Sequence, residues 1–211
     1  MARFHPAEDV LLDYAAGALH VGARLVVSTH LASCEVCRAT TNLADAVGGA
    51  LLDDLRPSSL SADALALALA RIERPAPPSA PSFKGPHDWI RVPDEVANAY
   101  RSRRRWAAPG VWVAPVTSNS DGSRSYLLRV GAGMSVPLHT HTGDEMVLVL
   151  KGGYSDGGRL HHPGDFALND ASINHNPRVL ADGECVCLIA ADDTLVPLSW
   201  VGRLFQPLVR I

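Results

Sequence analysis

The sequence predicts a two-domain protein of the α plus β class, with a small helical bundle followed by an all-β barrel. Apolar residues recur at helical spacing through residues 7–74, where β-branched residues are rare. Residues 75–86 then contain five prolines in twelve positions, a density that neither a helix nor a central strand tolerates. From residue 106 onward, short apolar runs are separated by Gly, Asn, Asp and Pro, as in strands joined by turns.

Four helices are expected in the first domain, residues 1–74. In chain order they cover the periodic stretch Leu11–Leu19, the stretch Leu25–His30, about residues 35–55, and Ser61–Glu73 with Ser61 as N-cap.

The fourth of these helices is apolar on nearly every side. It presents Leu65, Leu69 and Ile72 on one stripe and carries few charges. Such a helix must be covered by other apolar groups, either in the core of this protein or on the surface of a partner protein.

The proline-rich segment 75–86 is expected to be an extended, semi-rigid linker and the domain boundary. The second domain then spans residues 87–211 and begins with a short helix around Glu95–Arg105. The runs VWVAPV, SYLLRV and EMVLVLKG are short enough to be the strands of a barrel or sandwich.

Composition and charge exclude several classes of partner. The formal net charge of −3 gives no general attraction to nucleic acid or to an anionic membrane. The N-terminal residues do not resemble a secretion signal, and no apolar run is long enough to cross a bilayer. The four cysteines form one CxxC pair and one CxC pair, a pattern that favours a reducing cytoplasm over a disulfide framework.

The segment THLASCEVC places His30, Cys34 and Cys37 at positions i, i+4 and i+7. On one continuous helix, these side chains would share a face. Two thiolates and one imidazole suit zinc, and a structural zinc site needs a fourth ligand, for which His5 and His20 are available. A redox-active CxxC and two inert buried thiols are the alternatives. Because no strand-like run precedes Cys34, as it would in a thioredoxin-like motif, we expect zinc.

This HxxxCxxC motif, with His5 upstream, resembles the signature of the zinc-binding anti-sigma family over roughly residues 1–75. The resemblance implies that His5 is the fourth zinc ligand. It also implies that the helices insert between the two DNA-binding domains of a group IV (extracytoplasmic-function) sigma factor and so exclude RNA polymerase. A sigma factor would then cover the apolar stripe of the fourth helix.

A second constellation reads Gly133-x5-His139-x-His141-x3-Glu145-x6-Gly152. On a strand, His139 and His141 point to the same face, and a tight turn after them would return Glu145 toward both imidazoles. This pattern matches the first cupin motif at every fixed position, which implies a jelly-roll barrel with a metal inside.

The second cupin motif matches less well, because the spacer before Gly164 is missing and Asp170 stands where a proline is usual. We assign His175 as the fourth ligand, with His161 and His162 as rivals that look more like an exposed turn. Three imidazoles and one carboxylate suit zinc or another divalent transition metal, and some cupins hold no metal at all.

Cys185 and Cys187 lie two apart in a predicted strand and should face the same side. Burial as apolar residues is the interpretation we favour, and a role as oxidisable sensor thiols is the alternative.

A zinc anti-sigma module followed by a cupin is similar to the ChrR family of anti-sigma factors, over nearly the whole chain. The resemblance implies that the first domain inhibits a sigma factor and that the cupin releases it in response to singlet oxygen or organic hydroperoxide. The alternatives are a metal-dependent cupin enzyme, such as a dioxygenase or isomerase with a helical appendage, and a metal-storage or scaffold protein.

Overall fold

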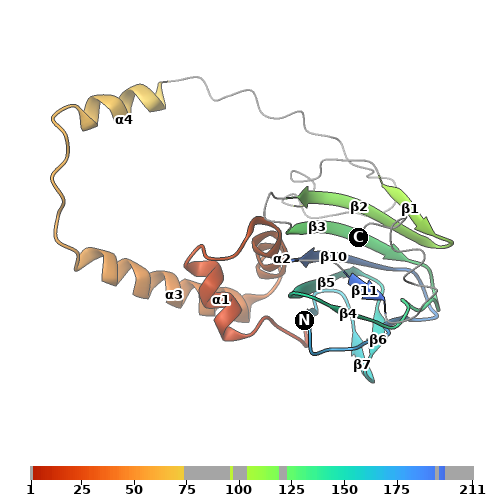
Figure 1. The fold of residues 1–211 in the computed structure, drawn as a ribbon. Helices are drawn as coiled ribbons and strands as arrows, with labels where there is room; N and C mark the ends of the chain where they lie inside the picture. Colours follow the sequence, from red (N-terminus) through yellow and green to blue (C-terminus); the bar gives the residue numbers. More distant parts are fainter. Residues whose placement is uncertain (1, 74–95, 97–103, 119–122, 193–194, 198–211) are drawn as a thin grey trace.

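The computed structural model describes residues 2–73, 96, 104–118, 123–192 and 195–197. In these residues, four α-helices precede eleven β-strands, which confirms the predicted order of a helical region and a β domain (Figure 1). The predicted linker over residues 75–86 and most of the predicted helix around residues 95–105 lie outside the described ranges.

The helices are α1 (Glu8–Ala15), α2 (Val21–Leu31), α3 (Glu35–Asp53) and α4 (Ala64–Ile72). The prediction that Ser61 caps the fourth helix is wrong. Asp63 occupies the N-cap position and makes no side-chain capping bond. Ser61 contributes only its carbonyl oxygen, which accepts the Ala64 N–H at 3.0 Å.

The geometry of one continuous helix, which would put His30, Cys34 and Cys37 on one face, does not apply. α2 ends at Leu31, and Cys34 is the extended N-cap residue of α3. The physical reason is distance, because seven residues of continuous helix rise about 10.5 Å. Such a helix would hold the side chains of His30 and Cys37 too far apart to meet at one ion, whereas the break between α2 and α3 lets them converge.

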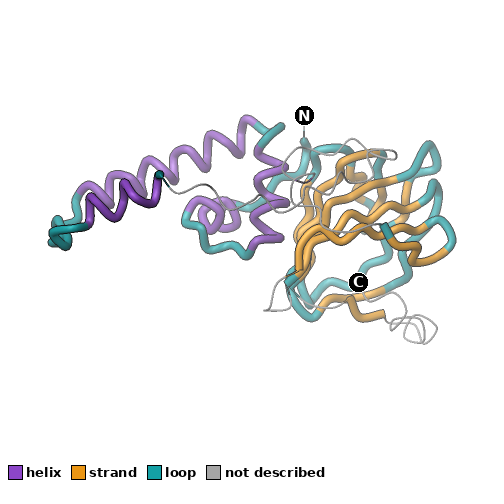
Figure 2. Tube along the Cα trace, turned by 90° about the horizontal axis from the view of Figure 1, so that it is seen from above, coloured by secondary structure: helices purple, strands orange, loops and turns teal. Residues whose placement is uncertain are grey.

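The β domain contains a six-stranded sheet in the order β1-β2-β3-β10-β5-β8, a three-stranded sheet β7-β6-β9 and a pair β11-β4. All of these pairings are antiparallel. Figure 2 shows the strands gathered on one side of the molecule and the helices on the other. The strands are β1 (Arg105–Ala108), β2 (Val111–Ser118), β3 (Arg124–Val130), β4 (His139–His141), β5 (Glu145–Lys151), β6 (Tyr154–Asp156), β7 (Arg159–His161), β8 (Phe166–Asn169), β9 (Arg178–Val179), β10 (Cys185–Ala191) and β11 (Leu195–Pro197).

One hydrophobic core joins α1 and α2 to the six-stranded sheet. Val26 of α2 and Leu188 of β10 are both fully buried in it. Strand alternation separates this core from the barrel interior, since Leu148 of β5 faces the helices while Val147 and Val149 belong to the interior cluster. The helical region is therefore packed onto the barrel and not merely tethered to it.

The distal part of the helical region contrasts with this core. α4 has no buried residue, and Cys37 and Thr41 are the buried residues of α3. Figure 1 shows α4 standing apart from the barrel, at the end of an arm that begins with α3. Among the described residues, no helix combines the length and apolar character needed to cross a membrane.

Candidate metal centres and partner-binding surface

Four donor side chains meet at the junction between α2 and α3, which we call the helical centre. The donor atoms of His5, His30, Cys34 and Cys37 all lie within 4.8 Å of one another. His5 Nδ1 is 3.3 Å from Cys34 Sγ and 3.5 Å from Cys37 Sγ. His30 Nε2 is 3.4 Å from Cys37 Sγ.

This geometry fits a tetrahedral zinc ion. Zn–S bonds of about 2.3 Å and Zn–N bonds of about 2.0–2.1 Å place a sulfur and a nitrogen ligand about 3.5 Å apart. The observed separations of 3.3–3.5 Å agree with that spacing. Two cysteines and two histidines make a closed, structural type of donor set.

Burial favours the neutral forms of two side chains of the helical centre. Burial raises the pKa of Cys37 to about 12, and the neighbouring Cys34 thiol adds to the shift. Burial lowers the pKa of His30, while a bond from its Nδ1 to the Gly164 carbonyl oxygen at 3.0 Å opposes that effect. Because Nδ1 donates to this carbonyl, Nε2 keeps its lone pair toward the cysteines. A divalent ion would stabilise the thiolate form that burial disfavours.

A second group of donors lies inside the barrel, which we call the cupin centre. β4 places His139 and His141 on its buried face, as strand alternation predicted. A turn over residues 142–144 returns the chain to Glu145, the first residue of β5. His175 comes from the loop between β8 and β9, and its backbone exchanges two 3.1 Å hydrogen bonds with that of His139.

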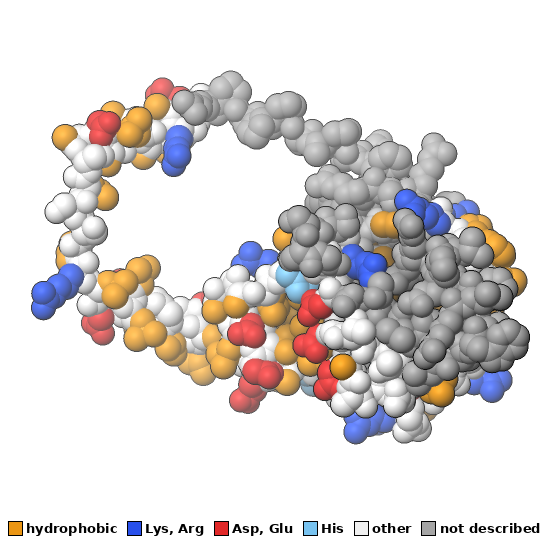
Figure 3. Space-filling view, viewed as in Figure 1, with side chains coloured by type: hydrophobic (Ala, Val, Ile, Leu, Met, Phe, Trp, Pro, Cys, Tyr) orange, Lys and Arg blue, Asp and Glu red, His pale blue; other side chains and the backbone are white. Residues whose placement is uncertain are grey.

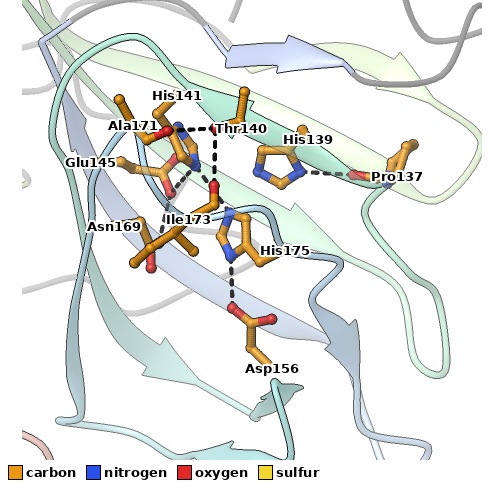
Figure 4. A network of polar contacts seen from close by, with 10 residues as sticks. All are labelled: Pro137, His139, Thr140, His141, Glu145, Asp156, Asn169, Ala171, Ile173 and His175. Carbon is orange, nitrogen blue, oxygen red and sulfur yellow. Dashed lines mark hydrogen bonds and ion pairs between the residues drawn. The ribbon is translucent and has the colours of Figure 1, made fainter.

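The three imidazoles of the cupin centre have ligand atoms within 4.8 Å of one another. His141 Nε2 is 3.0 Å from His175 Nε2, and Glu145 Oε2 is 3.5 Å from His141 Nε2 (Figure 4). Metal–nitrogen bonds of about 2.0–2.1 Å place neighbouring nitrogen ligands about 3.0–3.4 Å apart, so the arrangement fits a divalent transition metal. Glu145 lies beside the histidine triad and contacts it through His141.

Outer hydrogen bonds orient the cupin ligands. Asp156 Oδ2 accepts from His175 Nδ1 at 2.6 Å, and the Pro137 carbonyl accepts from His139 Nδ1 at 2.7 Å. Each bond leaves the Nε2 lone pair of its ring free for a metal. Asn169 donates to Glu145 at 3.2 Å. Sequence analysis did not identify Asp156 or Asn169, because neither stands at a position that the cupin motifs specify.

Burial also shifts the pKa values of the cupin ligands. It lowers the pKa of both His139 and His141 to about 4, so both rings are neutral at neutral pH and can act as ligands. Burial also raises the pKa of Glu145, although the bond from Asn169 opposes the shift. A bound cation would stabilise the charged carboxylate.

The remaining histidines considered for the two centres have other contacts. His20 caps α2 by accepting the Ala23 N–H at 3.2 Å, and its Nε2 lies 2.6 Å from Asp192. His161 is buried and stacks on Tyr154 with ring centroids 4.6 Å apart, whereas His162 is exposed. The prediction that both members of this pair lie in an exposed turn is therefore wrong for His161, because β7 directs its ring inward onto Tyr154.

Cys185 and Cys187 are buried on the same face of β10, with their Sγ atoms 3.6 Å apart. The hydrogen bond with Cys185 raises the pKa of Cys187 well above its ordinary value, and burial adds to the shift. Protonated buried thiols are slow nucleophiles, which favours a packing role. A sensor role for the pair stays a prediction.

The stripe predicted on the fourth helix is open to solvent, with exposed fractions of 72% for Leu65, 51% for Leu69 and 80% for Ile72. The sequence analysis did not predict that a second apolar stripe, on α3, is also exposed. Its members Leu43, Val47 and Leu51 are 67%, 53% and 65% exposed. Their helical spacing was visible in the sequence, but a helix that packs in a core has the same spacing.

Together these six side chains form what we call the arm surface, and hydrophobic side chains gather along both of its helices (Figure 3). Soluble monomers rarely expose apolar patches of this kind, so the arm surface is a candidate binding site for another protein.

Three comparisons with known proteins find the same family. A family model described as the ChrR cupin-like domain matches residues 96–193. Anti-sigma-E factor ChrR from Cereibacter sphaeroides is 35% identical over 214 residues, which cover 99% of each chain. A crystal structure of Rhodobacter sphaeroides SigE in complex with the anti-sigma ChrR superposes with a TM-score of 0.73 and 33% identity. That match covers 90% of this chain and 99% of the other.

Proposed function

The chain belongs to the ChrR family of anti-sigma factors, and from that premise we propose that it binds and inhibits a group IV (extracytoplasmic-function) sigma factor. An anti-sigma factor is a regulatory protein that acts by binding and not by catalysis. Family membership therefore argues against the competing interpretation, in which the cupin is a dioxygenase or isomerase. A partner that works with RNA polymerase would place the protein in the cytoplasm.

The observation that carries this proposal is the exposure of the arm surface. Its leucines, valine and isoleucine are each at least half exposed, and α4 buries none of its residues. A solvent-exposed apolar helix is stable when a partner covers it. The solved relative forms a complex with SigE, which supports a sigma factor as that partner.

The helical centre would fix the direction of the arm. Its ligands come from the segment before α1, from α2 and from the start of α3. A zinc ion held by His5, His30, Cys34 and Cys37 would join these segments, so that the energy of metal binding stabilises the fold of the helices. The sigma factor would then bind a surface whose orientation is fixed by the metal.

The cupin centre would take part in sensing. The metal held by His139, His141, Glu145 and His175 would supply a site at which singlet oxygen or an organic hydroperoxide can react. Oxidation there would favour a state of the protein with lower affinity for the sigma factor. The release requires the two states to differ in affinity, because a change with equal affinity in both states would shift no population.

The test is a binding measurement with a group IV sigma factor encoded beside this chain. The full-length protein and the sigma factor should co-elute as a complex in size-exclusion chromatography. A triple Leu65→Ser, Leu69→Ser, Ile72→Ser variant should lose the complex, since apolar anchors at an interface carry most of its binding energy. Its fold should be unchanged, because α4 buries no side chain.

Leu160→Ser is the matched control, because Leu160 is an apolar residue of the barrel that is 45% exposed. This variant should bind as the wild type does. Equal binding by the triple variant and the wild type would show that the arm surface does not contact the sigma factor.

A further inference from the structure

The N-terminal segment that carries His5 is docked on the barrel. The backbone N–H groups of Arg3 and Phe4 donate to Asp165 Oδ1 at 2.6 and 3.2 Å. The Phe166 N–H donates to the Phe4 carbonyl oxygen at 3.0 Å, which ties the segment to the first residue of β8. The barrel therefore holds the chain one residue before the ligand.

Asp165 is 1% exposed and belongs to the turn between β7 and β8. Its second carboxylate oxygen accepts the His162 N–H at 2.8 Å, so the side chain accepts three backbone N–H groups. Hydrogen bonds to a charged acceptor are stronger than those between neutral groups, so this carboxylate is a firm anchor for the N-terminal segment.

The neighbouring residue of the same turn contacts the helical centre directly. Gly164 has a φ of +93°, a conformation that residues with a side chain rarely adopt, and its carbonyl oxygen accepts from His30 Nδ1 at 3.0 Å. Two adjacent residues of one barrel turn thus support both histidine ligands of the helical centre.

A ring contact reinforces the docking. The Phe4 ring lies 4.8 Å from the His161 ring, and His161 stacks in turn on Tyr154 of β6. The N-terminal segment therefore has an apolar contact with the barrel in addition to its backbone bonds. The residues of the segment that make these contacts are Arg3 and Phe4.

We propose that the turn His162–Asp165 of the barrel completes the outer shell of the helical centre, with Asp165 as the positioning residue of His5. The proposal rests on the proposed function in one respect, that zinc occupies this centre. His5 is the exposed ligand of the four, while the other three are buried. Its position therefore depends on the docking of the preceding residues more than on its own packing.

The same turn leads toward the cupin centre. β8 begins at Phe166, which binds the N-terminal segment, and ends at Asn169, which donates to Glu145 at 3.2 Å. One four-residue strand has the docking site of His5 at one end and a contact to the cupin carboxylate at the other. A shift of Glu145 would therefore reach His5 through β8, and the zinc of the helical centre would be held less tightly.

The experiment measures metal release from the helical centre alone. The full-length protein is loaded with Co²⁺, and the thiolate-to-cobalt absorption reports this centre because the cupin donors include no sulfur. A chelator is added and the decay of the absorption is followed. Asp165→Asn should speed the decay at least tenfold, since removal of an outer-shell partner typically weakens metal binding about 10–100-fold.

A second variant and a control separate positioning from loss of stability. Phe4→Ala leaves the barrel core intact and should speed the decay by a smaller factor. Val130→Ala opens a space in the barrel interior, away from the N-terminal segment, and should leave the decay at the wild-type rate. Wild-type decay in both Asp165→Asn and Phe4→Ala would overturn the proposal. So would an equal acceleration by Val130→Ala, which would indicate a general effect of stability.

Transmission through β8 is tested by combining variants. His175→Ala, which removes a cupin ligand, should speed the decay in the wild-type background and add little to Asp165→Asn. If the double variant accelerates metal release by the product of the two single-variant factors, the two sites act independently. That result would overturn transmission through β8. A wild-type protein without thiolate–cobalt absorption would instead overturn the proposed zinc site itself, and the proposal with it.

Discussion

The two candidate metal centres are built in opposite ways. The helical centre gathers its ligands from the segment before α1, from α2 and from the start of α3, and it includes the exposed His5. The cupin centre takes its ligands from β4, the start of β5 and a loop bonded to β4, and all of them are buried. The backbone of the cupin centre is therefore fixed by strand pairing, whereas the helical centre lies outside the sheet and is supported by hydrogen bonds from one barrel turn to His30 and to the segment that carries His5.

This difference suits the two centres to different roles. When a metal holds the ligands of a centre together, the free energy of metal binding stabilises the fold. Loss of the metal then disrupts the surface that the centre shapes. A centre that is organised before the metal arrives can change its metal or ligands while the surrounding barrel persists. The first property suits a structural joint beneath a binding surface, and the second suits a sensor.

The largest expected effect tests the structural role of the helical centre. Cys34→Ser should lose one metal equivalent and destabilise the helical region by about 4–5 kcal/mol or more, as is typical when a structural metal is lost. Elemental analysis and thermal unfolding followed by far-UV circular dichroism measure the two effects.

His175→Ala is the comparison for this variant. It should also lose one metal equivalent, but with a much smaller change in the unfolding temperature, because strand pairing holds the cupin centre. Equal destabilisation by both variants would remove the distinction between the two centres.

A second prediction concerns the core that joins the two regions. Leu188→Ala should destabilise the protein by about 2–5 kcal/mol, since Leu188 is fully buried against α2. The chain has four tryptophans, of which Trp106 and Trp112 lie in β1 and β2. Helix circular dichroism and tryptophan fluorescence should shift to lower denaturant concentration together. A shift of the fluorescence transition alone would mean that α2 unfolds independently of the barrel.

A third prediction concerns the cupin centre alone. Asp156→Asn should weaken metal binding there about 10–100-fold, because the carboxylate that orients His175 is lost. Ser155→Ala, at the neighbouring and partly buried position of β6, is the control. Competition with a metal indicator measures both affinities, and an unchanged affinity in Asp156→Asn would exclude an orienting role for this carboxylate.

The smallest expected effect concerns the buried thiols. Cys185→Ala should leave metal content and sigma binding unchanged, because the residue packs in the barrel interior. If the pair assists sensing, release of the sigma factor by an organic hydroperoxide should slow severalfold, as measured by dissociation of the complex. Release at the wild-type rate would leave the two cysteines with a packing role only.

Much of the fold and many of the candidate ligands could be predicted from the sequence, because the relevant signals are local. The alternation around His139 and His141 and the turn that returns to Glu145 follow from strand geometry, and the structure has both. The convergence of Cys34 and Cys37 with His5 was expected from motif resemblance and is present. The apolar pattern of the fourth helix predicted a surface in need of cover.

The remainder depends on contacts between distant segments. The spacing of His30 and Cys37 indicated a shared face only on one continuous helix, whereas the break between α2 and α3 is what brings their donor atoms together. Asp165 binds the backbone of Arg3 across a separation of 162 positions, and Asp156 binds His175 across a separation of 19 positions. No local sequence pattern predicts such contacts. The exposure of α3 was missed because a buried helix has the same periodicity.

The most direct test of the account is the affinity for a group IV sigma factor, measured by calorimetric titration for three full-length proteins. With zinc in excess, so that the helical centre stays occupied, the wild type and His175→Ala should bind with similar affinity. Cys34→Ser should bind at least about 100-fold more weakly, or about 2.7 kcal/mol. This result would locate inhibition in the zinc-shaped arm. Undiminished binding by Cys34→Ser, or no binding by the wild type, would contradict the account.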